Sequence, residues 1–171
     1  LSESAIESGF VNHDFILSMI QLLQHSMEST SIQHENLIEI VASVFWLFSQ
    51  LLEKATPFCI NCFTPEFMES SFGICEKYPF QVKKEISFFI VTFIVVSDAE
   101  KLLPLINEKS FEIFDEMICC GIHYIANRMI DALFKIILKL CDSSLFPTIL
   151  SLIHESDIPH DLMNLSNDND M

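Results

Sequence analysis

The sequence predicts an all-α fold in which helical repeats stack as a solenoid. Two of the observations behind this prediction are compositional: half of the 171 residues are hydrophobic, and the chain holds 16 Phe but only 3 Gly. That balance favours long apolar helices over sheets joined by Gly-rich hairpins. The third observation is a period, because long apolar segments recur at intervals of 42 and 43 residues, a spacing typical of two- or three-helix repeats.

The period is set by three segments, residues 37–51, 85–95 and 128–140, which align when Trp46, Phe88 and Asp131 are placed in register. Shorter segments lie between them, and each reads as a short helix or turn that leads into a medium helix. These shorter segments are residues 5–25, 63–78 and 105–121. In the first of them, the side chains of Phe15, Met19, Leu22 and Leu23 recur at steps of three and four residues and are predicted to form a buried face.

Helix boundaries are predicted at three places. Thr56-Pro57 and Thr64-Pro65 each place a capping residue before a proline suited to the first turn of a helix. Ser97-Asp98 is expected to end one long helix and cap the next. These boundaries divide a single domain, residues 1–171, into a partial repeat (1–53), two repeats (54–97 and 98–141) and a second partial repeat (142–171).

Residues 86–96, ISFFIVTFIVV, conflict with this prediction locally, since β-branched and aromatic residues favour a buried strand. Their register with the two neighbouring segments favours a helix that is apolar nearly all round, as the element between adjacent repeats must be. Residues 156–171 are polar and look like the start of another repeat. A solenoid normally ends in a polar capping repeat, so we expect the chain to be part of a longer protein.

The charge of the chain is one-sided, with 24 Asp and Glu against 9 Lys and Arg and a net charge of −15. Such a field repels nucleic acid and anionic membranes and suits a basic protein segment, although acidity can also serve only to keep a Phe-rich protein soluble. The apolar run Ile86 to Val96 is too short to span a membrane, and residues 1–9 lack the pattern of a signal peptide. Six cysteines without a dense framework indicate a reducing compartment, the cytoplasm or nucleus.

Several phrases resemble the importin-α family. The run FQVKKEISFFIVTF, residues 80–93, is similar to a repeat motif of that family. The motif begins with basic, acidic and small residues, followed by a tryptophan and, four residues later, an asparagine. Residues 6–23 resemble that family's turn and second helix, residues 55–57 its Thr-Pro repeat opening, and residues 129–140 the longest helix of its last full repeat. The resemblance implies an armadillo-type right-handed α-solenoid (ARM/HEAT-like), and it covers residues 5–141.

The resemblance also implies a nuclear transport adaptor whose concave groove binds a basic nuclear localisation signal, or whose late repeats contact a transport receptor. In the groove of that family, tryptophans pack against the aliphatic parts of the peptide's lysine side chains, and asparagines one helical turn later form hydrogen bonds with the peptide backbone. The matching positions here are three pairs: Trp46 and Gln50, Phe88 and Thr92, Asp131 and Lys135. No asparagine is present among them, Thr92 offers only a hydroxyl, and Lys135 repels a basic peptide.

Two other interpretations remain open. The chain could be a divergent armadillo scaffold for protein interactions unrelated to nuclear import. Trp46, within the run VFWLF, could equally be a core residue of an apolar helix. An intact import adaptor would carry a basic arm and earlier repeats with complete Trp and Asn pairs.

The sequence contains few candidates for chemistry, and we expect neither an enzyme nor a bound metal or cofactor. Cys59 and Cys62 have the CxxC spacing of a zinc or redox site, but only Cys75 follows nearby, and four ligands are needed. The three thiols are expected to be reduced and packed as small hydrophobes. Cys119 and His123 could align on one helical face as a nucleophile and base, without a third residue to orient them.

Two further patterns have ordinary explanations. Glu112, Asp115 and Glu116 are expected to form the solvated face of a helix rather than an acid and base pair. Gly9, Gly73 and Gly121 are too far apart to build a nucleotide-binding loop. A cysteine-dependent enzyme or redox sensor is therefore the most distant alternative.

Overall fold

A computed structural model describes residues 12–28, 34–160 and 162–163 of the chain. Within these ranges every regular element is a helix, which confirms the all-α prediction. The chain divides into two compact units, unit 1 (Leu1–Val96) and unit 2 (Ser97–Met171). Each unit is described by itself.

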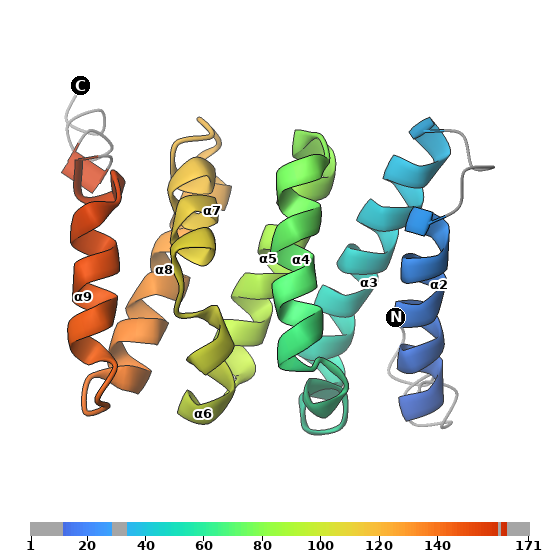
Figure 1. Ribbon diagram of the computed structural model, residues 1–171, viewed down its shortest axis with the longest axis horizontal. Helices are drawn as coiled ribbons and strands as arrows, with labels where there is room; N and C mark the ends of the chain where they lie inside the picture. The colour runs from blue at the N-terminus through green and yellow to red at the C-terminus, as the bar shows by residue number, and fades with distance from the viewer. Residues whose placement is uncertain (1–11, 29–33, 161, 164–171) are drawn as a thin grey trace. The chain divides into compact units, whose positions relative to one another are not determined.

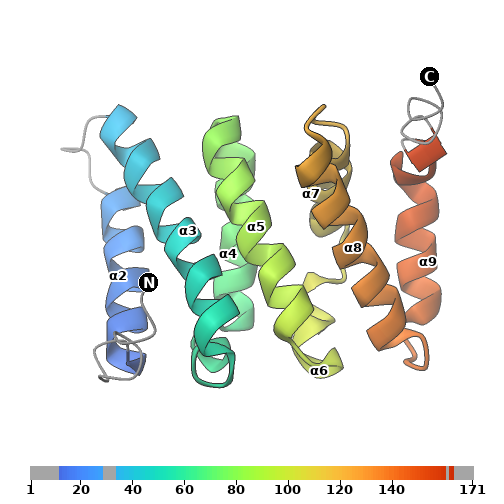
Figure 2. The ribbon, with the colours of Figure 1, turned by 180° about the vertical axis from the view of Figure 1, so that it is seen from behind.

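Unit 1 is built from α3, the longest helix, and the helices packed around it. α3 contacts α5 and α2, while α4 packs on α5 (Figures 1 and 2). The elements in chain order are α2 (His13–Glu28), α3 (His34–Cys59), the 3-10 helix η1 (Ile60–Cys62), α4 (Pro65–Lys77) and α5 (Phe80–Val96).

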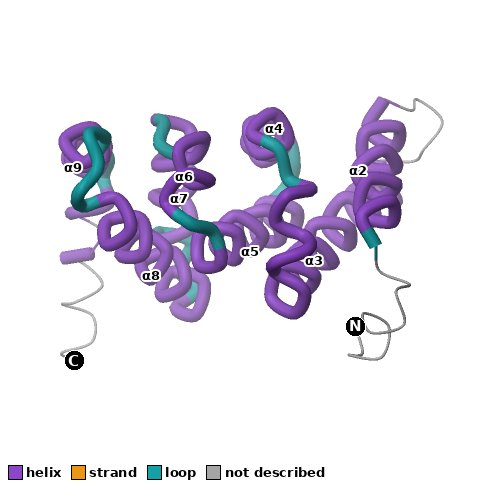
Figure 3. Tube along the Cα trace, turned by 90° about the horizontal axis from the view of Figure 1, so that it is seen from below, coloured by secondary structure: helices purple, strands orange, loops and turns teal. Residues whose placement is uncertain are grey.

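Unit 2 is arranged around α8, which contacts α6, α7 and α9, and α7 also contacts α9 (Figure 3). Its elements are α6 (Ala99–Leu102), the 3-10 helix η2 (Leu103–Leu105), α7 (Glu108–Ile118), α8 (His123–Leu140) and α9 (Phe146–Glu155). Helix α9 was not assigned from the sequence, although Pro147 in its first turn is a recognised helix-start signal.

Helix lengths follow the same order in both units. A short helix precedes a medium and then a long one: η1, α4 and α5 have 3, 13 and 17 residues. In unit 2 the four-residue α6 and three-residue η2 precede α7 and α8, with 11 and 18 residues. The predicted sequence of a short element, a medium helix and a long helix is therefore present in each unit.

Two of the three predicted helix boundaries are confirmed. The hydroxyl oxygen of Thr64 accepts a hydrogen bond from the Phe67 backbone N–H at 3.3 Å, and Pro65 is the first residue of α4. α5 ends at Val96, and the Asp98 carboxylate accepts a hydrogen bond from the Lys101 N–H at 3.1 Å, which caps α6. Both caps satisfy an N–H that the helix itself leaves without a partner.

The boundary predicted at Thr56-Pro57 is wrong, because α3 continues through both residues to Cys59. A proline inside a helix removes one backbone hydrogen bond and is normally destabilising. Here the segments on either side are fixed by burial, with Leu51 and Leu52 before the proline and Cys59 and Ile60 after it fully or nearly fully buried. Tertiary packing therefore overrides the local stop signal.

Residues 86–96 are helical, as the register argument predicted against their β propensity. α5 packs against both α3 and α4, and eight of these eleven residues are buried. A helix covered on several sides needs apolar residues all round, so β-branched residues are tolerated there. Burial against two neighbours outweighs a propensity difference that is well under about 1 kcal/mol per residue.

The buried face of α2 differs from the prediction. Leu23 is buried, as predicted, but Leu22 is 47% exposed, and Phe15 and Met19 are only partly buried. The buried positions of α2, which packs on α3, are instead Ile16, Ile20, Leu23 and Ser26. Both sets follow helical spacing, so the sequence pattern alone does not decide which face is turned inward. Residues 5–11 of the predicted segment 5–25 lie outside the described residues.

A cluster of phenylalanine rings forms the core of unit 1. Phe89 of α5 lies at its centre, with ring centroids 4.9 Å from Phe63, 5.6 Å from Phe45 and 5.9 Å from Phe48. Phe67 and Phe93 adjoin the same ring at 6.0 and 6.4 Å. Edge-to-face and tilted contacts at such distances stabilise beyond the area that they bury. The cluster joins α3, α4, α5 and the segment before α4.

By length and composition alone, one segment of the described residues, Glu35–Lys54, could cross a membrane. The core helix of a soluble protein meets the same criterion, so this is weak support for a membrane span. Within α3 this segment buries Phe45, Phe48, Leu51 and Leu52 in the core of unit 1.

Candidate protein-binding surfaces

α3 presents one polar face that contains an exposed tryptophan. Trp46 is 50% exposed, and Gln50, one helical turn later, is half-buried. Residues at steps of three and four lie on one side of a helix. The exposed and half-buried positions at this spacing form the α3 face: Glu39, Ser43, Trp46, Gln50 and Glu53.

The exposure of Trp46 rules out its interpretation as a core residue. The core positions of the run VFWLF are Val44, Phe45 and Phe48, each under 5% exposed. Trp46 lies on the other side of the helix, and the nearby charged positions on its face, Glu39 and Glu53, are acidic. The sequence could not separate these alternatives because apolar residues occupy both sides of α3 at this point.

The second predicted pair, Phe88 and Thr92, lies on α5 of the same unit but is much less accessible. Thr92 is only 3% exposed, and its hydroxyl donates a hydrogen bond of 2.8 Å to the Phe88 carbonyl one turn earlier. A Thr hydroxyl has a single donor proton, which is used within the helix. Thr92 therefore cannot substitute for a peptide-binding asparagine, while Phe88 remains partly exposed.

The third predicted pair, Asp131 and Lys135, lies on α8 in unit 2, and both side chains are exposed. Neither forms an ion pair with any residue that the structure describes. The large apolar side chains of Tyr124, Phe134 and Leu138 are 55%, 58% and 65% exposed on the same helix. Together with Asn127 and Asp131, these three residues follow steps of three and four along the exposed side of α8.

Lys139 marks the end of this helix. Its ammonium group donates a hydrogen bond of 2.6 Å to the Ser97 carbonyl and so ties the end of α8 to the first residue of unit 2. Burial lowers the pKa of Lys139, repulsion by Lys135 lowers it further, and Asp98 partly offsets both effects. The two lysines therefore create a locally positive end on α8.

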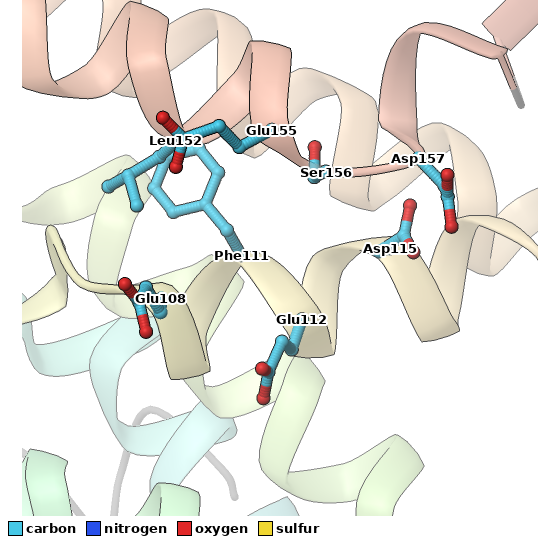
Figure 4. A pocket seen from close by; sticks show the side chains of 8 residues that line it. All are labelled: Glu108, Phe111, Glu112, Asp115, Leu152, Glu155, Ser156 and Asp157. Atoms are coloured by element: carbon cyan, nitrogen blue, oxygen red, sulfur yellow. The ribbon is translucent and has the colours of Figure 1, made fainter.

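Unit 2 also contains an acidic cavity of about 350 Å³. Figure 4 shows Phe111 and Leu152 in its wall, with carboxylates from α7 and from the end of α9 around them. These acidic residues are Glu108, Glu112, Asp115, Glu155 and Asp157. Glu112 and Glu116 are exposed, as expected for a solvated face, whereas Asp115 is half-buried. Unit 1 has a smaller cavity of about 260 Å³ lined by residues of α2 and α4.

The cysteines of the CxxC motif are buried, and none of the six cysteines, all within the described residues, forms a disulfide. Burial raises the pKa of the Cys59 thiol to about 11, with a further contribution from Cys62, and burial also raises the pKa of Cys62. Zinc ligation and nucleophilic attack both require thiolates, which these surroundings disfavour. Within the described residues, no group of three or more His, Cys, Asp and Glu side chains could hold a metal ion.

Cys119 and His123 do not share a helical face, so the predicted alignment is wrong. α7 ends at Ile118, Cys119 caps it, and His123 begins α8. Gly121 between them has φ of 74°, in the left-handed region that favours glycine and that reverses the chain between helices. The four-residue spacing therefore spans a turn.

No protein-family model matches the chain, and no curated protein or solved structure is significantly similar to it.

Proposed function

We propose that this chain is a protein-binding scaffold, an armadillo-type right-handed α-solenoid resembling an importin-α nuclear transport adaptor, and that its α3 face binds an extended basic peptide. The observation that carries the proposal is the half-exposed Trp46 in the middle of an otherwise polar and acidic helix face. An exposed tryptophan has a cost in water that a partner can recover by covering it.

The chemistry of the α3 face suits the side chain and backbone of a basic peptide. The ring of Trp46 offers a flat apolar surface for the stem of a lysine or arginine, and its π face attracts the cation. Gln50 offers an amide donor and acceptor to the peptide backbone. Glu39 and Glu53 are exposed on the same face, where they attract ammonium and guanidinium groups.

The repeat architecture has independent support. In both units a short helix precedes a medium and a long one, with the long helices α5 and α8 of 17 and 18 residues. The segments around their register positions, Phe88 and Asp131, are separated by 43 residues in the sequence. A solenoid repeat buries its apolar surface only against its neighbours, and the apolar α5 fits such a position.

A divergent scaffold unrelated to nuclear import is the second candidate. It is favoured by the buried Thr92, which removes one of the three expected peptide-binding pairs, and by Lys135, which places a positive charge at another. Both candidates use exposed helix faces for protein binding, and they differ in the ligand of the α3 face.

The test is a titration of the chain with a fluorescent localisation peptide rich in lysine, followed by fluorescence anisotropy at two salt concentrations. Binding should weaken at the higher salt concentration because exposed ion pairs are screened. Trp46→Ala should weaken binding by about tenfold or more, since a central aromatic contact is lost. Leu22→Ala, which shortens an exposed apolar side chain on α2, is the matched control and should bind like the original chain.

A peptide with the same composition in scrambled order separates the two candidates. Preference for the ordered peptide supports the transport adaptor, whereas equal binding of both peptides leaves only the divergent scaffold. The absence of any binding at low salt would refute the basic-peptide proposal for the α3 face.

A further inference from the structure

The exposed side of α8 combines large apolar side chains with one exposed lysine. Tyr124, Phe134 and Leu138 are each more than half exposed, and Lys135 lies beside them. We call this surface the α8 face, and it consists of Tyr124, Asn127, Asp131, Phe134, Lys135 and Leu138. Exposed large apolar groups aligned on one helix are typical of a surface that another protein covers.

The spacing of these residues matches the contact surface of a helix. The positions of Tyr124, Asn127, Asp131, Phe134 and Leu138 follow steps of three, four, three and four residues, as in the seam of two packed helices. The opposite side of α8 is already occupied by the core of unit 2, where Ile125, Met129 and Ile136 are fully buried. α8 therefore differs from an ordinary amphipathic surface helix, because it carries large apolar side chains on its solvent side as well as on its core side.

The charge of α8 is opposite to that of the chain as a whole. α8 holds three basic residues, Arg128, Lys135 and Lys139, against one acidic residue, Asp131, in a chain with a net charge of −15. The neighbouring α7 has four acidic residues and one lysine. On α5, by comparison, Lys84 is paired with Glu85 at 2.9 Å, whereas Lys135 has no ion pair among the described residues.

Lys135 and Lys139 lie one helical turn apart at this end of α8 and repel each other. Burial is the main cause of the lowered pKa of Lys139, this repulsion lowers the pKa further, and Asp98 acts in the opposite direction. A carboxylate from a partner near Lys135 would relieve this repulsion.

We propose that the α8 face binds an acidic amphipathic helix of a partner protein, whose apolar side chains cover Phe134 and Leu138 and whose carboxylates face Lys135. This is a different surface and a ligand of opposite charge from the basic peptide of the α3 face, and the inference stands without that proposal. The helix-on-helix mode follows from the regular helical spacing of the exposed positions, three of which are large apolar residues.

A second copy of this chain fits the surface less well. Two copies that met through their α8 faces would bring like-charged lysines together and would add the repulsion between two chains of net charge −15. The carboxylates of an acidic helix, by contrast, attract Lys135. Asp131, in the middle of the α8 face, repels any carboxylate placed opposite it and so restricts the register of the bound helix.

The probe for the test is a synthetic amphipathic helix as long as α8, with Leu at steps of three and four residues and Glu at the remaining positions. Its binding to the whole chain is measured by fluorescence anisotropy, with a second probe in which Lys replaces every Glu. The acidic probe should bind more tightly, and its affinity should fall as the salt concentration rises.

Two substitutions on the α8 face should weaken binding of the acidic probe, and a third should strengthen it. Phe134→Ala and Lys135→Glu should each weaken binding of the acidic probe by about tenfold, through the lost apolar contact and the reversed charge. Asp131→Asn should strengthen binding by about threefold, a gain that a folding defect cannot produce. Lys109→Glu, an equal charge change on exposed α7, and Leu150→Ala, at an exposed position of α9, are the matched controls.

Specific binding of the acidic probe with these three effects would establish the inference. Equal or tighter binding of the Lys probe would overturn it, as would an acidic-probe affinity that Lys135→Glu and Lys109→Glu change equally. Analytical ultracentrifugation tests self-association separately. If the original chain is a dimer and Phe134→Ala dissociates it, the α8 face is a surface for self-association and the inference is overturned.

Discussion

At the scale of single residues, burial decides the chemistry of the cysteines. Cys59, Cys62 and Cys75 are each at most 3% exposed, and the raised pKa values of Cys59 and Cys62 keep these two thiols protonated at neutral pH. A protonated thiol is a poor nucleophile and a poor metal ligand. The CxxC spacing in this chain is therefore best explained by the packing of η1 against its neighbours.

The raised pKa of Cys59 gives a prediction about stability at high pH. Because the pKa is about 11 in the folded chain and 9.0 in the reference state, the unfolded thiol ionises first, and stability is lost as the pH rises from about 9 to 11. The Cys59→Ala variant has no thiol at this position and does not lose stability in this way. The decrease in the free energy of unfolding that the substitution causes, measured by urea unfolding, should be about 1 kcal/mol smaller at pH 10 than at pH 8.

Cys141→Ala is the control for this measurement, because Cys141 is exposed and its removal takes no thiol from the core. A cost of Cys59→Ala that stays constant from pH 8 to pH 10 would contradict the explanation by burial.

At the scale of elements, caps and packing share the control of helix ends. Thr64, Asp98 and Asn107 each accept a hydrogen bond from the N–H three residues later and begin α4, α6 and α7. Where burial on both sides opposes a stop signal, as at Thr56-Pro57, the helix continues. Capping residues therefore begin these three helices, whereas burial on both sides keeps α3 continuous through Thr56-Pro57.

The cap of α7 can be tested by substitution. Asn107 Oδ1 accepts hydrogen bonds from the Ser110 backbone N–H at 3.1 Å and from the Ser110 hydroxyl at 3.2 Å. Asn107→Ala should lower the free energy of unfolding by about 1 kcal/mol, since it leaves an N–H at the helix start without its side-chain acceptor. Chemical denaturation followed by circular dichroism measures the change.

Asn107→Asp is the matched variant, because the carboxylate keeps the acceptor and interacts favourably with the helix dipole. Equal destabilisation by Ala and Asp would show that the cap is not the source of the effect.

At the scale of the whole molecule, the dominant property is its excess of negative charge. A net charge of −15 on 171 residues opposes the compact state by self-repulsion. The positive charges are unevenly distributed, and the long helices α5 and α8 contain five of the nine: Lys83, Lys84, Arg128, Lys135 and Lys139. Three of these five lie on α8, whereas the charged positions of the α3 face, Glu39 and Glu53, are acidic.

Self-repulsion predicts that salt stabilises the chain. Raising sodium chloride from about 20 mM to 500 mM shortens the Debye length to a few ångströms and should raise the melting temperature by a few degrees. Thermal unfolding followed by circular dichroism provides the measurement. Potassium chloride at the same ionic strength should give the same increase, and a fall in melting temperature would indicate that local ion pairs outweigh the net repulsion.

The sequence by itself determined the all-α fold, the order of short, medium and long helices, the helical state of residues 86–96 and the caps at Thr64 and Asp98. These features follow from local signals, namely apolar periodicity over long segments and side chains that bond the first turn of a helix. The resemblance to importin-α and the repeat boundaries remain predictions.

Only the tertiary structure decided which side of each helix is buried. The inward face of α2, the exposure of Trp46, the burial of Thr92 and the exposed Phe134 all depend on which neighbours pack on α2, α3, α5 and α8. In a chain that is half hydrophobic, several faces of one helix are apolar enough to be buried. Contacts between segments distant in the sequence select among those faces, and the candidate binding surfaces are the faces left exposed.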